Sequence, residues 1–117
     1  MQASSKRLSQ QAREVLQDPE NQLFLSAASS WEIAIKYALG KLPLPLEPMA
    51  YVLSRMETSG TSPLPVQHSH ALHVGSLPLH HADPFDRLLI AQAQMENLQI
   101  LTADRQFEAY EVDLLRA

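Results

Sequence analysis

The amino-acid sequence predicts an α/β domain with a mostly parallel sheet. The first observation is a set of short apolar runs bounded by polar residues, such as QLFLS at 22–26, which are typical of buried strands. The second is a set of segments in which apolar residues recur every three or four positions, as expected for amphipathic helices. The third is that acidic residues open several of these helices. Strands that alternate with helices favour parallel pairing, because each crossover carries a helix.

The composition fits one ordinary globular domain. The chain has 117 residues and a mass of 13.1 kDa, enough to bury a hydrophobic core. Hydrophobic residues make up 45% and charged residues 19%, which is typical of globular proteins. The formal net charge of −4 argues against a passive nucleic-acid coat, but it does not argue against a nuclease, whose own carboxylates make its site acidic.

The absence of cysteine excludes disulfides, thiol catalysis and cysteine-based zinc sites. No apolar run approaches the ~18 residues that a membrane span needs, and the start MQASSKRLSQQ is too polar for a signal peptide. We therefore expect a cytoplasmic protein that makes no contact with a membrane.

The elements of the first half follow from their apolar spacing. Residues 8–17 carry apolar side chains on one face and predict an amphipathic helix, which a turn separates from the strand at 22–26. The next helix is expected to take Ser29 or Ser30 as its cap and to close at Gly40.

The middle of the chain predicts shorter elements. The proline-rich segment PLPLEP leads into a second amphipathic helix at 48–56. A strand is expected at 64–66, and a helix that carries several histidines is expected at 69–74.

The last third predicts the longest helix, at 84–96. Pro84 suits its first turn, and Asp83 suits the capping position directly before it. A strand at 99–102 then runs into Asp104, which is expected to open another short helix, and the tail YEVDLL predicts a final edge strand.

Three carboxylates share one sequence context. Glu32, Asp86 and Asp104 each lie at or near the start of a helix that follows a strand or an extended segment. In an open α/β sheet the strand carboxyl ends and the helix starts meet at one edge, so these acids are candidates to converge. Mg²⁺ and Mn²⁺ prefer such oxygen ligands. A cation held there could lower the pKa of a water and polarise a phosphoryl oxygen, which is the chemistry of phosphodiester hydrolysis.

Each acid alone also has a structural explanation, because a carboxylate at a helix start accepts hydrogen bonds from free N–H groups and complements the helix dipole. For Asp83 this capping role is the preferred interpretation, and a role as a metal ligand is secondary. Asp86 differs, because it lies within the first turn of a helix whose opposite face, LLIAQA, must be buried.

Several other residues invite a functional interpretation. Five histidines lie between residues 68 and 81, but their spacing matches no closed zinc pattern, and we expect loop and helix-surface positions for them. Trp31 is expected in the core or at a dimer interface. Arg87 either reaches a phosphate or pairs with a neighbouring acid, and Lys36 is one turn from Glu32 and can pair with it.

Three sequence segments resemble those of a known family. SAASSWEIAIKYALGKLPLP, followed by LPLHHADPFDRLLIAQA and LTADRQFEAY, closely resembles the PIN-domain toxins of bacterial VapBC toxin–antitoxin systems. The resemblance covers about residues 8–112. It implies a Rossmann-like three-layer sandwich, Mg²⁺- or Mn²⁺-dependent endoribonuclease activity, a homodimer, and neutralisation by a VapB-type antitoxin that inserts a segment into the active groove.

The resemblance also implies roles for individual acids. Glu32, Asp86 and Asp104 match the acids that hold the metal and carry catalysis in this family, and Asp83 matches the first Asp of its D-P-F-D block, where its role is less certain. We expect local cations to grip the RNA, because the overall charge does not favour it. The candidates for RNA binding are Lys36, Arg87 and Arg105.

The start of the chain departs from the family. Family members begin with an apolar strand that ends in an Asp-Thr-His-type motif, where this chain has MQASSKR. We expect a single PIN-like domain over 1–117 that is shortened at its N-terminus and lacks one metal-binding Asp and a central strand. A sheet without that strand has unpaired N–H and C=O groups, so the chain must either close the gap locally or pair with a partner chain by strand exchange. We expect dimerisation to cover part of the exposed sheet. The alternative function is an inactive PIN remnant that acts as a dimerisation or antitoxin-binding module.

Overall fold

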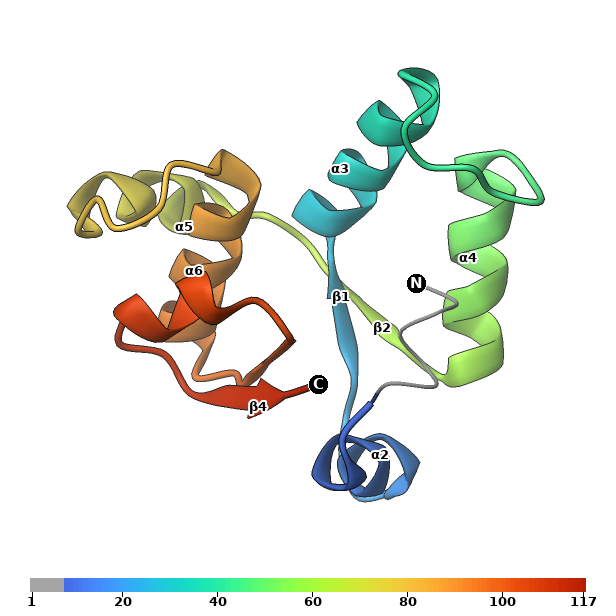
Figure 1. The fold of residues 1–117 in the computed structure, drawn as a ribbon, viewed down its shortest axis with the longest axis horizontal. Coiled ribbons are helices and arrows are strands. Elements are labelled where there is room, and N and C mark those ends of the chain that lie inside the picture. Colours follow the sequence, from blue (N-terminus) through green and yellow to red (C-terminus); the bar gives the residue numbers. More distant parts are fainter. Residues whose placement is uncertain (1–7) are drawn as a thin grey trace. The chain divides into compact units, whose positions relative to one another are not determined.

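The computed structural model describes residues 8–117, which form two compact units (Figure 1). Unit 1 comprises residues 8–21 and 67–117, and unit 2 comprises the stretch between them, 22–66. The expectations about the segment MQASSKR and the strand that it replaces lie outside the described residues. Each unit contains one pair of parallel strands, which agrees with the predicted α/β class.

Unit 1 begins with helix α2 (Gln10–Gln17), which Ser9 caps by accepting a hydrogen bond from the backbone N–H of Ala12. The Ser9 hydroxyl also donates to the carbonyl of Arg116, at 2.8 Å. Ala12 is fully buried on the inner face of the helix, whereas most of the other α2 residues are polar and exposed. This short helix is therefore linked to the C-terminal end of the unit through its capping residue.

The rest of unit 1 contains the elements that position the candidate site. They are α5 (His68–His73), the 3₁₀ turn η1 (Val74–Ser76), α6 (Pro84–Glu96), β3 (Ile100–Thr102), the 3₁₀ helix η2 (Arg105–Ala109) and β4 (Leu114–Arg116). Strands β3 and β4 pair in parallel, with Leu101 opposite Leu115. Asn97 ends α6 in the left-handed conformation at φ 56°, which asparagine tolerates better than most residues.

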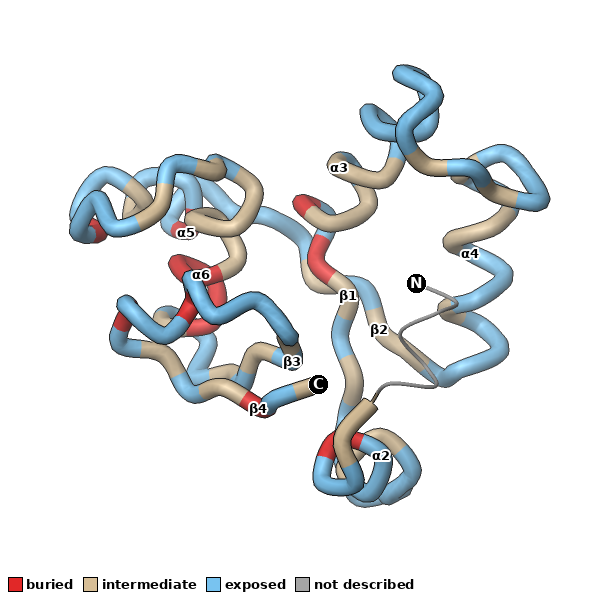
Figure 2. The backbone as a smooth tube through the Cα atoms, viewed as in Figure 1, coloured by how far each residue is buried: buried red, intermediate tan, exposed pale blue. Residues whose placement is uncertain are grey.

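Helix α6 forms the centre of the core of unit 1. Ile90, Ala91, Gln92 and Ala93 are buried along it, so Figure 2 shows a continuous buried stretch in α6. The apolar core is formed by residues of α6 and η2 and by the residues that directly follow η1 and η2; they are Leu77, Ile90, Ala91, Phe107 and Tyr110. Partly buried residues pack against this core; they are Val74, Ile100, Val112 and Leu114. The core thus holds the middle of α6 against η2 and the residue that follows it.

Unit 2 contains β1 (Phe24–Ser26), α3 (Ala27–Ala38), α4 (Pro48–Ser59) and β2 (Ser62–Leu64). Its two strands are parallel and in register, with Leu25 opposite Pro63. The helix ends follow the expected chemistry. Gly60 caps the end of α4 with a positive φ, and Gly40, two residues after the end of α3, also has a positive φ, which a residue without a Cβ adopts without strain.

The structure corrects two sequence-based boundaries in unit 2. Helix α3 begins three residues earlier than Ser30, because Ser26 caps it by accepting from the N–H of Ala28. The prediction of Ser29 or Ser30 as the cap was therefore wrong, and Glu32 lies in the second turn rather than the first. Strand β2 ends at Leu64, where the prediction began its strand.

No helix within residues 8–117 is long and apolar enough to cross a bilayer. The longest described helix, α6, has 13 residues and rises about 20 Å, against a hydrocarbon core of about 30 Å.

Candidate functional site

The start of α6 has the local chemistry that its sequence predicted. Asp83 is the N-cap, and its Oδ1 accepts hydrogen bonds from the N–H groups of Phe85, at 2.8 Å, and Asp86, at 3.2 Å. Pro84 occupies the first turn, where no N–H is needed. The capping prediction for Asp83 is confirmed, and one of its two carboxylate oxygens is occupied by that role.

Asp86 lies one turn further on and has a different partner. The Nε2 atom of His81 lies 2.8 Å from Asp86 Oδ2. An ionised carboxylate can only accept, so the imidazole donates through Nε2–H. The side chains are 13% exposed for His81 and 18% for Asp86, so this contact is mostly shielded from water. The pair is held at the surface end of α6, close to the Asp83 cap.

The hydroxyl of Tyr110 holds the chain segment that carries His81. It accepts hydrogen bonds from the backbone N–H groups of His80, at 3.1 Å, and His81, at 2.9 Å. Its ring is buried in the core at 5% exposure, and the ring of His80 packs edge-on against it. The loop before α6 is therefore anchored to the core through one oxygen atom.

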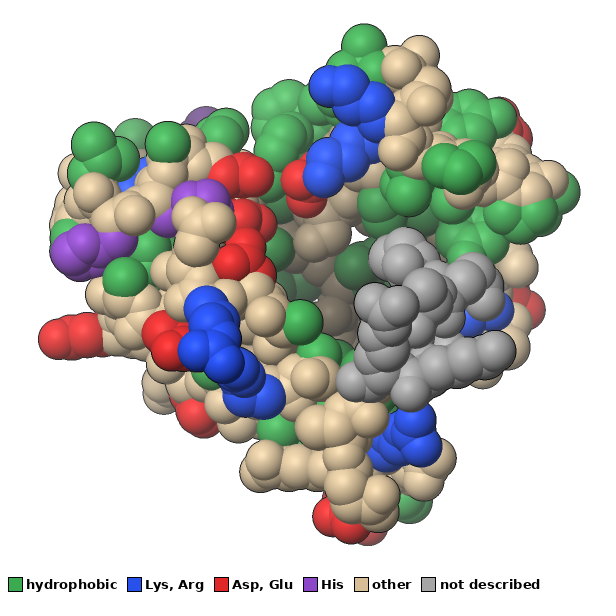
Figure 3. All heavy atoms as spheres, viewed as in Figure 1, with side chains coloured by type: hydrophobic (Ala, Val, Ile, Leu, Met, Phe, Trp, Pro, Cys, Tyr) green, Lys and Arg blue, Asp and Glu red, His purple; other side chains and the backbone are tan. Residues whose placement is uncertain are grey.

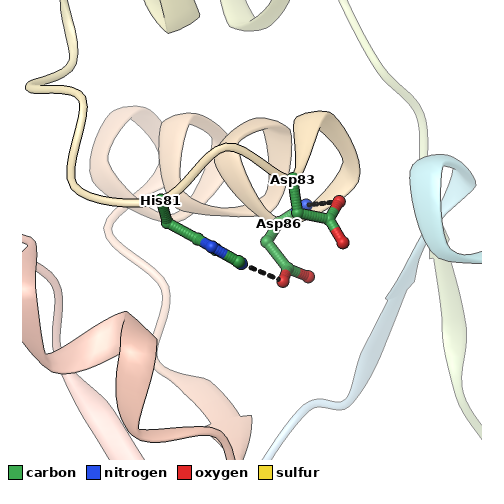
Figure 4. A group of neighbouring side chains, drawn as sticks. All are labelled: His81, Asp83 and Asp86. Carbon is green, nitrogen blue, oxygen red and sulfur yellow. Dashed lines mark hydrogen bonds and ion pairs between the residues drawn. The ribbon is translucent and has the colours of Figure 1, made fainter.

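The three side chains at this point form a compact donor group. Figure 4 shows the His81 ring directed at Asp86 while Asp83 turns to the helix N–H groups. One ligand atom from each of His81, Asp83 and Asp86 can be chosen so that all lie within 4.8 Å of one another. Two ligand atoms of one Mg²⁺ or Mn²⁺ ion lie at most about 4.2 Å apart. Small rotations of these side chains would therefore bring their ligand atoms within reach of one cation. Carboxylate oxygens with a neighbouring imidazole suit Mn²⁺, and the oxygens suit Mg²⁺.

Asp104 also lies in unit 1, at the end of β3. It caps η2 by accepting from the N–H of Gln106, at 2.9 Å, and its own N–H donates to Thr102 Oγ1. Asp104 and Arg105 are exposed. Asp104 is not a member of the compact group formed by His81, Asp83 and Asp86. The structure therefore brings two of the four predicted acids together and places Asp104 at the carboxyl end of a strand, as predicted.

Glu32, the fourth predicted acid, belongs to unit 2. Its Oε2 lies 3.0 Å from Nζ of Lys36, four residues later on α3. The predicted i,i+4 pair is confirmed, and it stabilises an exposed helix by about 0.3–0.5 kcal/mol.

Arg87 is engaged by the protein itself. Its guanidinium donates to the carbonyls of Pro78, at 2.9 Å, and Val74, at 3.1 Å, and to the hydroxyl of Tyr110, at 3.1 Å. These bonds tie η1 and the following loop to α6. Contact with a phosphate would compete with these hydrogen bonds. RNA binding by Arg87 stays a prediction, and the alternative is that the guanidinium only holds the loop against α6.

Two further histidines, His70 and His73, have structural partners in unit 1. His70 is 1% exposed, its Nδ1 accepts from the N–H of Gln67, and its Nε2 lies 2.9 Å from Glu96 Oε2. His73 Nε2 lies 2.8 Å from Gln94 Oε1. The expected surface position was therefore wrong for His70, which joins α5 to α6 from a buried site.

Sequence reasoning missed His81 and Tyr110 as parts of the site. In the sequence, His81 is one of five histidines between residues 68 and 81, and it lies two residues before the capping Asp83. That proximity was the available signal. Tyr110 gave no signal, because it lies 29 residues further along the chain and approaches His81 only when the chain folds.

The capping role of Asp83 can be tested by its effect on stability. Replacing Asp83 with alanine is expected to lower the free energy of unfolding by about 1 kcal/mol, because two helix N–H groups lose their acceptor. Replacing it with serine, which also caps, should restore most of that stability. Urea denaturation followed by circular dichroism measures both. Equal stability of the alanine variant and the unmodified protein would contradict the capping role.

Comparison with known families and proteins adds the following. Residues 3–113 match the PIN domain, so one family match spans both units. Over 63 residues the chain is 54% identical to Ribonuclease VapC16 of Mycobacterium tuberculosis (strain ATCC 25618 / H37Rv). The matched stretch covers 54% of this chain and 45% of that protein, so the match spans less than half of the relative's length.

Proposed function

Because the chain belongs to the PIN-domain family, we propose that it is a metal-dependent endoribonuclease of the VapC type, the toxin of a toxin–antitoxin pair. The observation that supports this most directly is the donor group at the start of α6. There, Asp83 and Asp86 lie beside His81 within the reach of one cation. The relative that is 54% identical over 63 residues is named a ribonuclease, and this is the class of activity that we propose for the chain.

Asp86 is the proposed principal ligand of the metal at this point. Its carboxylate is largely shielded from water, and its Oδ2 accepts a hydrogen bond from Nε2–H of His81. Asp83 has its Oδ1 occupied by the helix start, so its other oxygen would be the one turned to the ion. Bound Mg²⁺ or Mn²⁺ would activate a water as the nucleophile and stabilise the charge that develops on the phosphoryl oxygens.

Glu32 and Asp104 complete the proposed set of metal-binding and catalytic acids. Their assignment rests on the resemblance of the SSWEIA and LTADRQF motifs to those of the family. Asp104 is exposed at the end of β3, where a carboxylate is open to a ligand from solvent. We propose that Lys36 and Arg105, which are both exposed, contact the RNA backbone by charge, and Arg87 remains a third candidate.

The proposed partners are an RNA substrate, a VapB-type antitoxin and a second copy of the chain. Exposed apolar side chains on the α3–α4 part of unit 2 support a protein-binding role (Figure 3). They are Trp31, Leu39, Leu46, Met49 and Leu53. With Trp31 59% exposed, its interpretation as a core residue was wrong, and a role at an interface stays a prediction. Cellular RNA as the substrate would place the activity in the cytoplasm.

Cleavage of a labelled RNA by the purified chain tests the proposal. We expect cutting in the presence of Mg²⁺ or Mn²⁺, loss of cutting when EDTA is added, and recovery when either metal is supplied in excess. These results follow if the carboxylates act only through a bound cation. Product ends mapped on a sequencing gel distinguish endonucleolytic cuts from trimming.

A folded sample that cuts no RNA with either metal would contradict the nuclease proposal. It would favour the alternative, a PIN-domain module that binds an antitoxin or a second copy without catalysis. Cutting that persists in EDTA would indicate a contaminating metal-independent ribonuclease.

A further inference from the structure

We propose that His81 and Tyr110 are positioning residues for the metal-binding carboxylate of Asp86. The inference rests on the proposed nuclease function. It adds two residues that orient the carboxylate of Asp86 and that the sequence motifs did not identify. In this arrangement Tyr110 fixes the backbone of His81, and His81 fixes the carboxylate of Asp86.

The contact between His81 and Asp86 selects one carboxylate oxygen. Because Nε2–H of His81 donates to Oδ2 at 2.8 Å, the carboxylate cannot rotate freely about its Cβ–Cγ bond. Hydrogen bonds of this kind orient ligating carboxylates in metal proteins, and their loss typically lowers metal affinity or activity about 10- to 100-fold.

The position of His81 depends in turn on the hydroxyl of Tyr110. This oxygen accepts from the N–H groups of His80 and His81 and from the guanidinium of Arg87, and it lies 3.4 Å from the carbonyl of His81. A loop of this kind has no sheet or helix ladder to hold it, so these contacts determine where its backbone lies.

The rigidity of the arrangement comes from the core of unit 1. Tyr110 is 5% exposed and packs with Phe107 and Ile90. Because the ring is buried, the position of its hydroxyl is fixed. Arg87 binds the same hydroxyl and two carbonyls of the preceding segment. The path from core to ligand therefore runs through hydrogen bonds that are each 3.1 Å or shorter, from Tyr110 to His81 and from His81 to Asp86.

The test measures Mn²⁺ affinity directly, by the loss of the electron paramagnetic resonance signal of free Mn²⁺, alongside thermal stability. Replacing His81 with leucine should weaken Mn²⁺ binding about 10- to 100-fold, and replacing it with glutamine, whose amide N–H can donate from a similar position, should restore most of the affinity. Tyr110→Phe should weaken binding about tenfold, because only the hydroxyl is lost. Tyr37→Phe, which alters an exposed tyrosine of unit 2, is the matched control and should bind normally.

The outcomes separate the two proposals. If the unmodified chain binds Mn²⁺ and loses binding on Asp86→Asn, while His81→Leu and Tyr110→Phe bind as well as the unmodified chain, the positioning role is overturned and the metal site stands. A melting temperature that falls in Tyr110→Phe without any change in Mn²⁺ affinity has the same meaning. If His81→Gln fails as severely as His81→Leu, His81 is itself a ligand and the positioning role is wrong. No Mn²⁺ binding by the unmodified chain would overturn both proposals.

Discussion

Replacing Asp86 with asparagine is expected to reduce the rate of RNA cleavage by at least about 100-fold, which corresponds to about 2.7 kcal/mol of transition-state stabilisation. The substitution removes the negative charge but keeps the size of the side chain and an oxygen that can accept from His81 Nε2–H. The local structure should therefore survive while metal binding is lost. Single-turnover cleavage at saturating Mn²⁺ measures the effect.

Asp113→Asn is the matched control for this experiment. Asp113 is an exposed acid of the same unit, and the substitution changes charge and shape in the same way. It should leave the rate within about twofold of the unmodified chain, in line with the small effects of most surface substitutions. Equal rates for Asp86→Asn and the unmodified protein would remove Asp86 from the site.

Replacing Phe107 with alanine should lower the free energy of unfolding by about 3–5 kcal/mol. Phe107 is 4% exposed and packs in the core of unit 1 with Ile90 and Tyr110, so truncation leaves a cavity as well as losing apolar contact. Because domains of this size are stabilised by about 5–15 kcal/mol, a substantial part of the total would be lost. Urea denaturation of the variant and the unmodified chain measures the difference.

Leu72→Ala provides the comparison at an exposed position of the same unit. Leu72 is 78% exposed on α5, so its truncation should change the free energy of unfolding by no more than about 0.5 kcal/mol. If Phe107→Ala were as stable as Leu72→Ala, the assignment of Phe107 to the core would be wrong.

The sequence predicted the parts of the fold whose causes are local. Asp83 caps α6 and Asp104 caps η2 because each side chain can reach N–H groups two or three residues ahead. The missed cap of α3 has the same kind of cause. Ser26, Ser29 and Ser30 are all able to cap, and the choice among them depends on where β1 ends, which tertiary pairing with β2 decides.

The candidate site was predictable only in part, for a related reason. Asp86 could be identified from its place in a helix start and in a recognisable motif. Its contact with His81 spans five residues through an irregular loop, and the loop is held by a tyrosine 29 residues further on. The spacing of apolar residues in the sequence predicts helices and strands, but it does not predict contacts of this kind. The burial of His70 was missed in the same way, because its partner Glu96 is 26 residues distant.

The bond between Ser9 and the carbonyl of Arg116 has a consequence for how the chain folds. Unit 1 joins residues 107 positions apart, while unit 2 is a continuous segment inserted between its two pieces. Contacts between residues so far apart in the sequence lower the folding rate, because the entropy of closing the long loop is lost before the contacts stabilise the chain. During synthesis, unit 2 can assemble first, whereas α2 must wait for β4 to be made.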